Sequence, residues 1–226
     1  MIALVKKNRY FFILYLLFLI VGAYILIHFN KGEFELLINQ NYTCPFFDFL
    51  FKVTTEFGNG WFFVIVIVVC AFIKFRYTLL TAASFILSGL LTQLFKHVLF
   101  PNEERPVAFF KNQYELHIVP GIDIHYQNSF VSGHSASAFA CFAMIAFMGR
   151  NKHRGPLLCL IAILTAFSRV YLLQHFFVDV YVGSLVGLLT TMIIFYFIEN
   201  NPTLQSKSWM NKSLLTLRKK NDEAAG

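Results

Sequence analysis

Long apolar blocks separated by shorter polar segments dominate the pattern along the chain. Six blocks stand out, running from Tyr10 to Phe29, Trp61 to Ile73, Leu79 to Phe95, His134 to Met148, Gly155 to Leu173 and Phe176 to Phe197. A helix needs about 20 mostly apolar residues to cross the hydrocarbon core of a bilayer. Most blocks approach this length, and Phe57 and Gly58 can lengthen the short Trp61 block. The pattern therefore predicts an all-α membrane protein with six transmembrane helices in a bundle.

Lysine and arginine residues flank these blocks unequally. Thirteen of the nineteen lie before the first block or after the second, fourth and sixth blocks. Loops that stay in the cytoplasm carry an excess of Lys and Arg. We therefore expect both termini in the cytoplasm, with residues 30–60 and 96–133 facing outward. Residues 1–200 would form one membrane domain, and residues 201–226 a cytoplasmic tail.

The composition agrees with this picture and excludes other classes of protein. The chain of 226 residues is 57% hydrophobic, 18% aromatic and only 14% charged, which is unlike an ordinary soluble domain. Its net charge of +7 would suit a nucleic-acid partner. However, the basic residues lie beside the apolar blocks and form no run long enough to follow a duplex. Residues 10–29 exceed the usual apolar length of a signal peptide, so we expect an uncleaved first helix.

The two outward segments differ in character. In residues 30–60, Asp48, Lys52 and Glu56 recur every four residues after Pro45, which predicts a helix with one narrow polar stripe. Such a helix would either lie at the membrane interface or pack on the bundle. Residues 96–133 form a long, polar, proline-containing loop, and long loops usually carry function.

Four polar clusters fall at the outward ends of the predicted spans. The first pairs Lys96 with Arg105, which is followed by Pro106. Two fixed cations could clamp an anion, because a guanidinium offers a two-pronged contact to phosphate oxygens and an ammonium adds a point charge. Alternatively, Lys96 extends from a helix end toward the membrane surface, as lysines there commonly do.

The second cluster is Val131-Ser132-Gly133-His134, directly before the fourth span. Ser132 is a plausible N-cap, and Gly133 lets backbone approach a ligand closely. The amides of the following helix start would form an anion site. His134 could donate a proton to a departing oxygen, although a histidine at a helix end can also be purely structural.

The third cluster is Ser168 with Arg169, and the fourth is His175 with Asp179. Residues four apart share one face of a helix. A carboxylate beside a histidine can hold one ring nitrogen protonated and leave the other free as a nucleophile. Asp179 would also lie within an apolar helix, where an ionisable group is costly and points to function.

Taken together, the clusters resemble the three motifs of the type 2 phosphatidic acid phosphatase superfamily, membrane lipid phosphatases related in their site to vanadium haloperoxidases. Ser168, Arg169, His175 and Asp179 match the third motif in full. Val131 stands where the second motif has proline. Eight residues rather than six separate Lys96 from Arg105.

The resemblance implies a metal-independent reaction without a cofactor. His175 would attack phosphorus and Asp179 would orient it, while His134 would protonate the leaving oxygen. The phosphate would be held by six residues: Lys96, Arg105, Ser132, Gly133, Arg169 and Ser168. The outer histidines His97, His117 and His125 lack the short spacings of zinc ligands, so no metal site is expected.

The predicted function is therefore hydrolysis of a lipid phosphate monoester or diphosphate at the outer leaflet, through a phosphohistidine. Undecaprenyl diphosphate, phosphatidylglycerol phosphate, phosphatidic acid and lipid A phosphates are the candidate substrates, and the sequence does not choose among them. A bacterial inner membrane is the expected location, with the polar catalytic pocket on the periplasmic or extracytoplasmic side. The alternatives are a phosphatase of a soluble phosphate ester and a non-catalytic transporter of anionic lipid. The oligomeric state stays unknown.

Overall fold

The computed structural model describes residues 1–111, 113–149 and 151–217, and these fold as helices without a strand. The helices are α1 Ile2–Lys7, α2 Arg9–His28, α3 Glu33–Asn41, α4 Pro45–Thr54, α5 Gly60–Ile73, α6 Phe75–Leu94, α7 Pro106–Phe109, α8 Gly133–Met148, α9 Gly155–Tyr171, α10 Phe177–Asn200 and α11 Pro202–Gln205. The all-α prediction is thus confirmed. Four of the basic residues used to predict the topology lie outside the described residues: Arg150, Arg218, Lys219 and Lys220.

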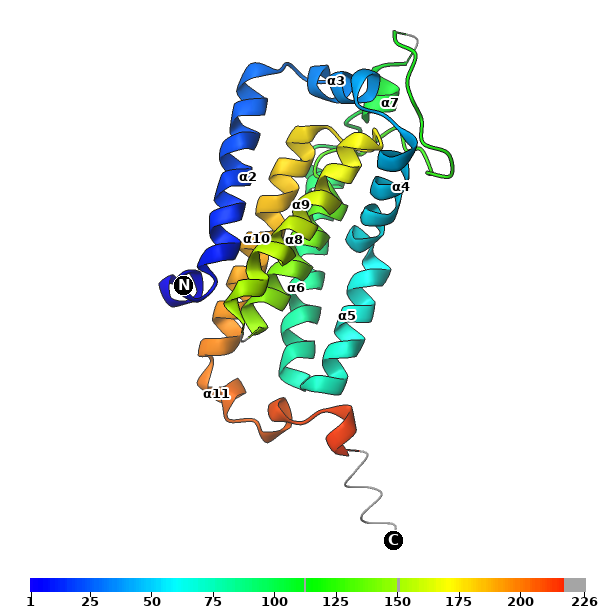
Figure 1. Cartoon of the computed structure of the whole chain (residues 1–226). Helices are drawn as coiled ribbons and strands as arrows, with labels where there is room; N and C mark the ends of the chain where they lie inside the picture. Colours follow the sequence, from blue (N-terminus) through cyan, green and yellow to red (C-terminus); the bar gives the residue numbers. More distant parts are fainter. Residues whose placement is uncertain (112, 150, 218–226) are drawn as a thin grey trace.

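The long helices run alongside one another as a bundle (Figure 1). Helices α6, α8, α9 and α10 form its centre, with α2 on one side and the α4–α5 pair on the other. Helices α3 and α7 and the loop before α8 lie at one end, whereas α1 and α11 lie toward the opposite end. The two outward segments of the sequence therefore meet at the same end of the bundle.

Each predicted apolar block is found in a helix, but the helices differ in length. Helix α2, α6 with its continuation to Leu99, and α10 are long and apolar enough to cross a membrane. Helices α4 and α5 form a pair bent by 54°, which passes the same test if counted as one span. Helices α8 and α9 have only 16 and 17 residues. By length and composition alone, the described residues thus give three or four spans.

Small residues let the central helices α8 and α10 approach closely. A Cβ atom on Gly187 would lie 2.2 Å from the Ala136 carbonyl oxygen, and one on Gly183 would lie 2.6 Å from the Ser132 carbonyl oxygen. Two glycines four residues apart form one smooth helix face, which is a common means of packing helices tightly in a membrane. The Thr191 hydroxyl adds a hydrogen bond of 3.2 Å to the Ala140 carbonyl. The α8–α10 crossing is therefore fixed by backbone contact.

The polar stripe of α4 faces the protein. Asp48 accepts hydrogen bonds from the Tyr171 hydroxyl (2.6 Å) and contacts the His117 ring (3.0 Å), while Lys52 donates to the Pro120 carbonyl (2.8 Å). Helix α4 therefore packs on the bundle, which was one of the two alternatives from the sequence. The other flank of α4 leaves Phe46 and Phe49 largely exposed.

Substitution of Gly187 by alanine should destabilise the fold, because the added methyl group meets the rigid backbone of α8. Overpacking of this kind typically costs about 1–3 kcal/mol. Gly89 on α6 is the matched control, because a Cβ there meets nothing within 4 Å. Gly89→Ala should leave the unfolding temperature in detergent unchanged or raise it, since alanine favours a helix over glycine. Equal melting of Gly187→Ala and wild type would contradict this account.

Candidate active site

The short connection between α9 and α10 sets Arg169 and His175 beside each other. Leu173 has a left-handed backbone (φ 52°), and the amides of Leu173 and Gln174 donate to the carbonyls of Val170 (3.0 Å) and Arg169 (2.8 Å). This pairing is a Schellman motif, which closes the end of α9. The His175 amide also donates to the Arg169 carbonyl (3.1 Å). These backbone hydrogen bonds therefore fix the positions of Arg169 and His175 relative to each other.

The His175 ring lies against the Asp179 carboxylate. The Nδ1 atom of His175 is 3.3 Å from the Asp179 Oδ2 atom, and that oxygen also accepts from the Phe176 amide (3.0 Å) and the Ser129 hydroxyl. The carboxylate partner favours a proton on Nδ1 and leaves a lone pair on Nε2. Burial, with the neighbouring charges of Arg105 and Lys96, holds the pKa of His175 well below its usual value. A lowered pKa favours the neutral imidazole, which has a ring nitrogen free to react.

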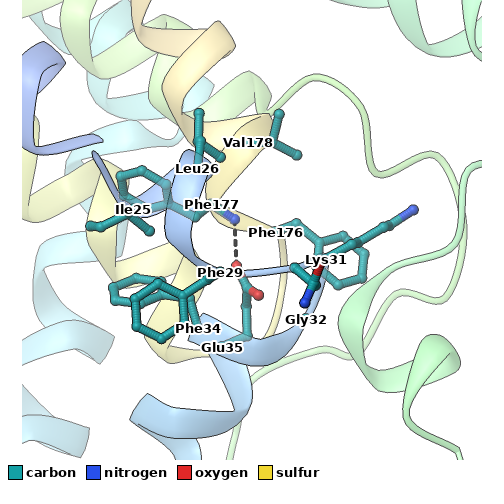
Figure 2. A pocket seen from close by; sticks show the side chains of 11 residues that line it. Ile25, Leu26, Phe29, Lys31, Gly32, Phe34, Glu35, Phe176, Phe177 and Val178 are labelled. Carbon is teal, nitrogen blue, oxygen red and sulfur yellow. Dashed lines mark hydrogen bonds between the residues drawn. The ribbon is translucent and has the colours of Figure 1, made fainter. Parts of the chain in front are cut away.

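A second buried carboxylate fixes the start of α10. The Glu35 side chain, on α3, accepts a hydrogen bond of 2.6 Å from the Phe177 amide (Figure 2). Burial raises the pKa of Glu35 above its usual range. Acidic groups at a helix N-terminus bond otherwise unpaired amides and interact favourably with the helix dipole. Glu35 and Asp179 thus hold in place the helix end that carries the histidine.

The start of α8 has the geometry of an N-capped helix. The Ser132 Oγ atom accepts from the Ser135 amide (3.3 Å), as predicted for an N-cap. The Ser132 amide donates to the Asp179 carbonyl (3.1 Å). This bond joins α8 to α10 beside the pair formed by His175 and Asp179, which we call the dyad. A Cβ on Gly133 would meet nothing within 4 Å, so this amide end borders open space. Such a position suits backbone contact with an anion.

Two buried guanidinium groups lie close together around Gln174. Arg105 donates to the carbonyls of Gln127 (2.9 Å) and Gln174 (3.1 Å). Arg169 donates to the Thr55 hydroxyl (2.7 Å) and to the Gln174 Oε1 atom (3.3 Å). Only 7% of Arg105 and 6% of Arg169 are exposed, and within the described residues neither pairs with a carboxylate. Burial lowers the pKa of Arg105.

Two donors in this cluster have no partner. The Nε atom of Arg169 and the Nε2 atom of Gln174 are buried without a hydrogen bond among the described residues. Buried donors are almost always paired, so these two are available to bind a ligand. Two cations without a close carboxylate partner and two free donors are suited to an oxyanion with several oxygens.

The two remaining predicted phosphate-binding residues, Lys96 and Ser168, differ in their surroundings. Lys96 lies in a π-helical turn, Phe95–Leu99, and its charge acts on His175 together with that of Arg105. Ser168 is fully buried, and its hydroxyl donates to the Thr165 carbonyl (2.6 Å). The Ser168 hydroxyl is thus engaged within its own helix. Ser129, Thr55 and Gln174 were not predicted, and only the position of Gln174 inside the third motif could have pointed to it.

A cavity of about 190 Å³ opens beside this cluster and is lined by both His134 and Arg169. It therefore borders both the histidine expected to donate a proton and the buried Arg169 side chain. Within the described residues, no group of three or more His, Cys, Asp or Glu side chains is placed to hold a metal ion. The arrangement can thus hold an oxyanion, present a nucleophilic nitrogen and supply a proton at a second histidine.

Comparisons with known proteins find two solved structures with a similar fold. The crystal structure of LpxE from Aquifex aeolicus is similar in fold, with a TM-score of 0.65 and 24% identity over 76% of this chain and 98% of that chain. A transmembrane PAP2-type phosphatidylglycerolphosphate phosphatase from Bacillus subtilis gives a TM-score of 0.61 and 24% identity over 90% and 98%. No curated protein sequence matches significantly.

The sequence itself matches the model of the PAP2 superfamily over residues 77–203, which include all the predicted site residues. The apolar helices and the fold together indicate a multi-pass membrane protein. Because the matched region exceeds half of the chain, the protein belongs to the PAP2 superfamily of phosphatases, as its motifs indicated.

Proposed function

We propose that this protein is a metal-independent lipid phosphatase that works through a phosphohistidine at His175. One observation carries the proposal: the His175–Asp179 dyad lies beside two buried guanidiniums that have no carboxylate partner and leave the Arg169 Nε atom unpaired. A phosphoryl group supplies the missing negative oxygens. The dyad supplies the nucleophile. A nucleophile beside a site for a phosphoryl group is the arrangement that phosphoryl transfer requires.

The reaction follows from these positions. The His175 Nε2 atom attacks phosphorus, and the bond from phosphorus to the leaving oxygen breaks as the N–P bond forms. His134 donates a proton to that oxygen, which leaves as an alcohol. His134 then takes a proton from water, which attacks the phosphohistidine and releases phosphate. Asp179 stabilises the charge on the His175 ring throughout.

Cations and amides stabilise the transition state. Arg105, Arg169 and Lys96 face the charge that spreads over the phosphoryl oxygens, and the amides at Ser132 and Gly133 can contact the same group. Fixed donors in a site that excludes water stabilise developing charge far better than donors in water do. These groups perform the neutralisation that bound metal ions perform in many other phosphoryl-transfer sites.

The substrate proposed is an amphiphilic phosphate. The two similar structures are named as LpxE and as a phosphatidylglycerolphosphate phosphatase, and the fold shared with them supports a lipid substrate. Phosphatidylglycerol phosphate, phosphatidic acid, lipid A phosphates and undecaprenyl diphosphate are all compatible with phosphoryl transfer at this site.

The proposed topology has six spans, with α8 and α9 as short central helices. Helix α8 is buried along most of its length by α6, α9 and α10, so it need not match the bilayer thickness alone. The excess of basic residues at the end bearing α1 and α11 supports a cytoplasmic position for both termini. The catalytic site then opens on the periplasmic or extracytoplasmic side.

Single cysteines test this orientation in a Cys44→Ser background, because the other three native cysteines are buried. A cysteine at Tyr114, in the outer loop, should react with an impermeant reagent in intact cells. A cysteine at Gly149, after α8, should react only after permeabilisation. The permeabilised sample serves as the control for intrinsic reactivity. Labelling of position 149 but not position 114 in intact cells would show that the protein has the opposite orientation.

The two histidines can be separated by the basicity of the leaving group. His134→Ala should reduce hydrolysis of an alkyl phosphate by about 100-fold to 10,000-fold, the typical effect of a lost general acid. An aryl phosphate should lose much less, because a phenolate leaves without a proton. His175→Ala should abolish both reactions, since no nucleophile remains.

The measurement is the ratio of aryl to alkyl turnover in detergent-solubilised protein. His153→Ala is the matched control, because that exposed histidine lies at the other end of the bundle, next to Tyr10. A ratio that rises for His175→Ala and stays constant for His134→Ala would reverse the two assignments. No phosphate release by wild type from either ester would refute the proposed function.

A further inference from the structure

Two neighbouring cavities lie at the opposite end of the bundle from the dyad, toward α1 and α11 (Figure 1). The first has a volume of about 230 Å³ and is lined by the end of α1, the start of α6 and the last turns of α8 and α10. It lies where α8 ends at Met148 after 16 residues, whereas α10 has 24 residues. We call this space the basic cavity.

The basic cavity carries a net positive charge. Four charged side chains line it: Lys7, Lys74, Arg76 and Glu199. Arg76 and Glu199 form an ion pair, with the Arg76 Nε atom 2.6 Å from the Glu199 Oε1 atom. The Lys7 ammonium donates to the Phe147 carbonyl at the end of α8 (3.2 Å), and neither lysine pairs with a carboxylate in the described part of the chain. Three cations and one carboxylate leave a net charge of +2.

Several donors around the basic cavity are free to bind a ligand. The Lys74 ammonium and the Tyr77 hydroxyl form no hydrogen bond within residues 1–111, 113–149 and 151–217. Arg76 gives its Nε atom and one terminal nitrogen to Glu199, which leaves its other terminal nitrogen unbonded among the same residues. Ammonium and guanidinium groups form strong, charge-assisted hydrogen bonds to phosphate. The basic cavity is therefore suited to a phosphate group.

The bias of basic residues toward one end of the bundle does not explain this arrangement by itself. That bias requires only that basic residues lie at this end. Lys6 on α1 meets the requirement while it is exposed and lines neither cavity. Lys7 and Lys74, in contrast, come from distant segments of the chain and line the same cavity. Their convergence indicates a specific anionic ligand.

The second cavity adds room for an apolar chain. Its volume is about 340 Å³, and it shares Lys7, Phe195 and Glu199 with the basic cavity. Its further lining includes Leu4 on α1 and Tyr196 on α10. Sites for organic ligands commonly measure roughly 300–1,000 Å³. An inorganic anion would occupy only the basic cavity, whereas a phospholipid can place its phosphate there and an acyl chain in the second cavity.

We infer that the two cavities bind one anionic phospholipid, with its phosphate in the basic cavity and an acyl chain between α1 and α10. Lys7, Lys74 and the free nitrogen of Arg76 contact the phosphate oxygens. No histidine is among the described residues that line either cavity, so this lipid is held as a ligand and is not hydrolysed there. In the proposed topology this end faces the cytoplasm, where basic pockets between membrane helices suit anionic head groups. The bound lipid joins the ends of α1, α6, α8 and α10.

A lipid titration of the full chain in a neutral detergent tests the inference. Palmitoyl-oleoyl phosphatidylglycerol should raise the unfolding temperature, because a ligand of the folded state stabilises it. The measured quantity is the lipid concentration that gives half of the maximal rise. Lys74→Gln should increase this concentration about fivefold, the contribution of one lysine beside an anionic head group. Inorganic phosphate, even in large excess, should cause no such rise, because it lacks the acyl chain.

Lys6→Gln is the matched control, because it removes the same charge from the same end of the bundle without touching either cavity. Its half-saturating lipid concentration should equal that of wild type. Lys74 has no side-chain partner among the described residues, so Lys74→Gln should fold as wild type does. Lipid bound near the dyad contributes equally to all three proteins. Equal half-saturating concentrations in wild type, Lys74→Gln and Lys6→Gln would overturn the inference, as would inorganic phosphate that reproduces the rise.

Discussion

The close contact between α8 and α10 is the constraint on which the site depends. Gly183 and Gly187 bring the backbone of α10 against the carbonyls of Ser132 and Ala136. This contact places the N-terminus of α8 next to the first turn of α10, where the Ser132 amide bonds the Asp179 carbonyl. The capped start of α8 and the contact between His175 and Asp179 at the start of α10 therefore share one small volume. Neither helix could form the site alone.

The same volume concentrates positive charge that no carboxylate pairs with at close range. Arg105 and Arg169 are both buried and share Gln174 as a hydrogen-bond acceptor, although their charges repel. Burying unpaired charge is expensive. The structure compensates with backbone carbonyls and hydroxyls, which accept from the guanidiniums without cancelling their charge. Stability is thus lower than an apolar core would give, and the positive field that the proposed reaction requires is kept.

The sequence predicted the helices and the contact between His175 and Asp179, because both depend on local spacing. Apolar block length gives the helices, and the four-residue separation of His175 and Asp179 places them on one face. The bend between α4 and α5 was not foreseen, because Phe57 and Gly58 fit an extension of the Trp61 block, whereas they belong to a separate short turn, Thr55–Gly58. Gln174, Ser129 and Thr55 were missed for a different reason. Their roles come from neighbours that are distant in sequence, such as Thr55 with Arg169.

The Schellman closure at Leu173 also explains where this chain can change its length. A residue inserted between Arg169 and His175 would break the paired backbone bonds that position both groups, so this spacing is fixed. The segment between Lys96 and Arg105 has no such pairing across it, because it passes through a π-helical turn and an irregular stretch. Insertions can be absorbed there while the guanidinium stays anchored by Gln127 and Gln174. The first motif therefore has two extra residues in this chain, whereas the third motif keeps its usual length.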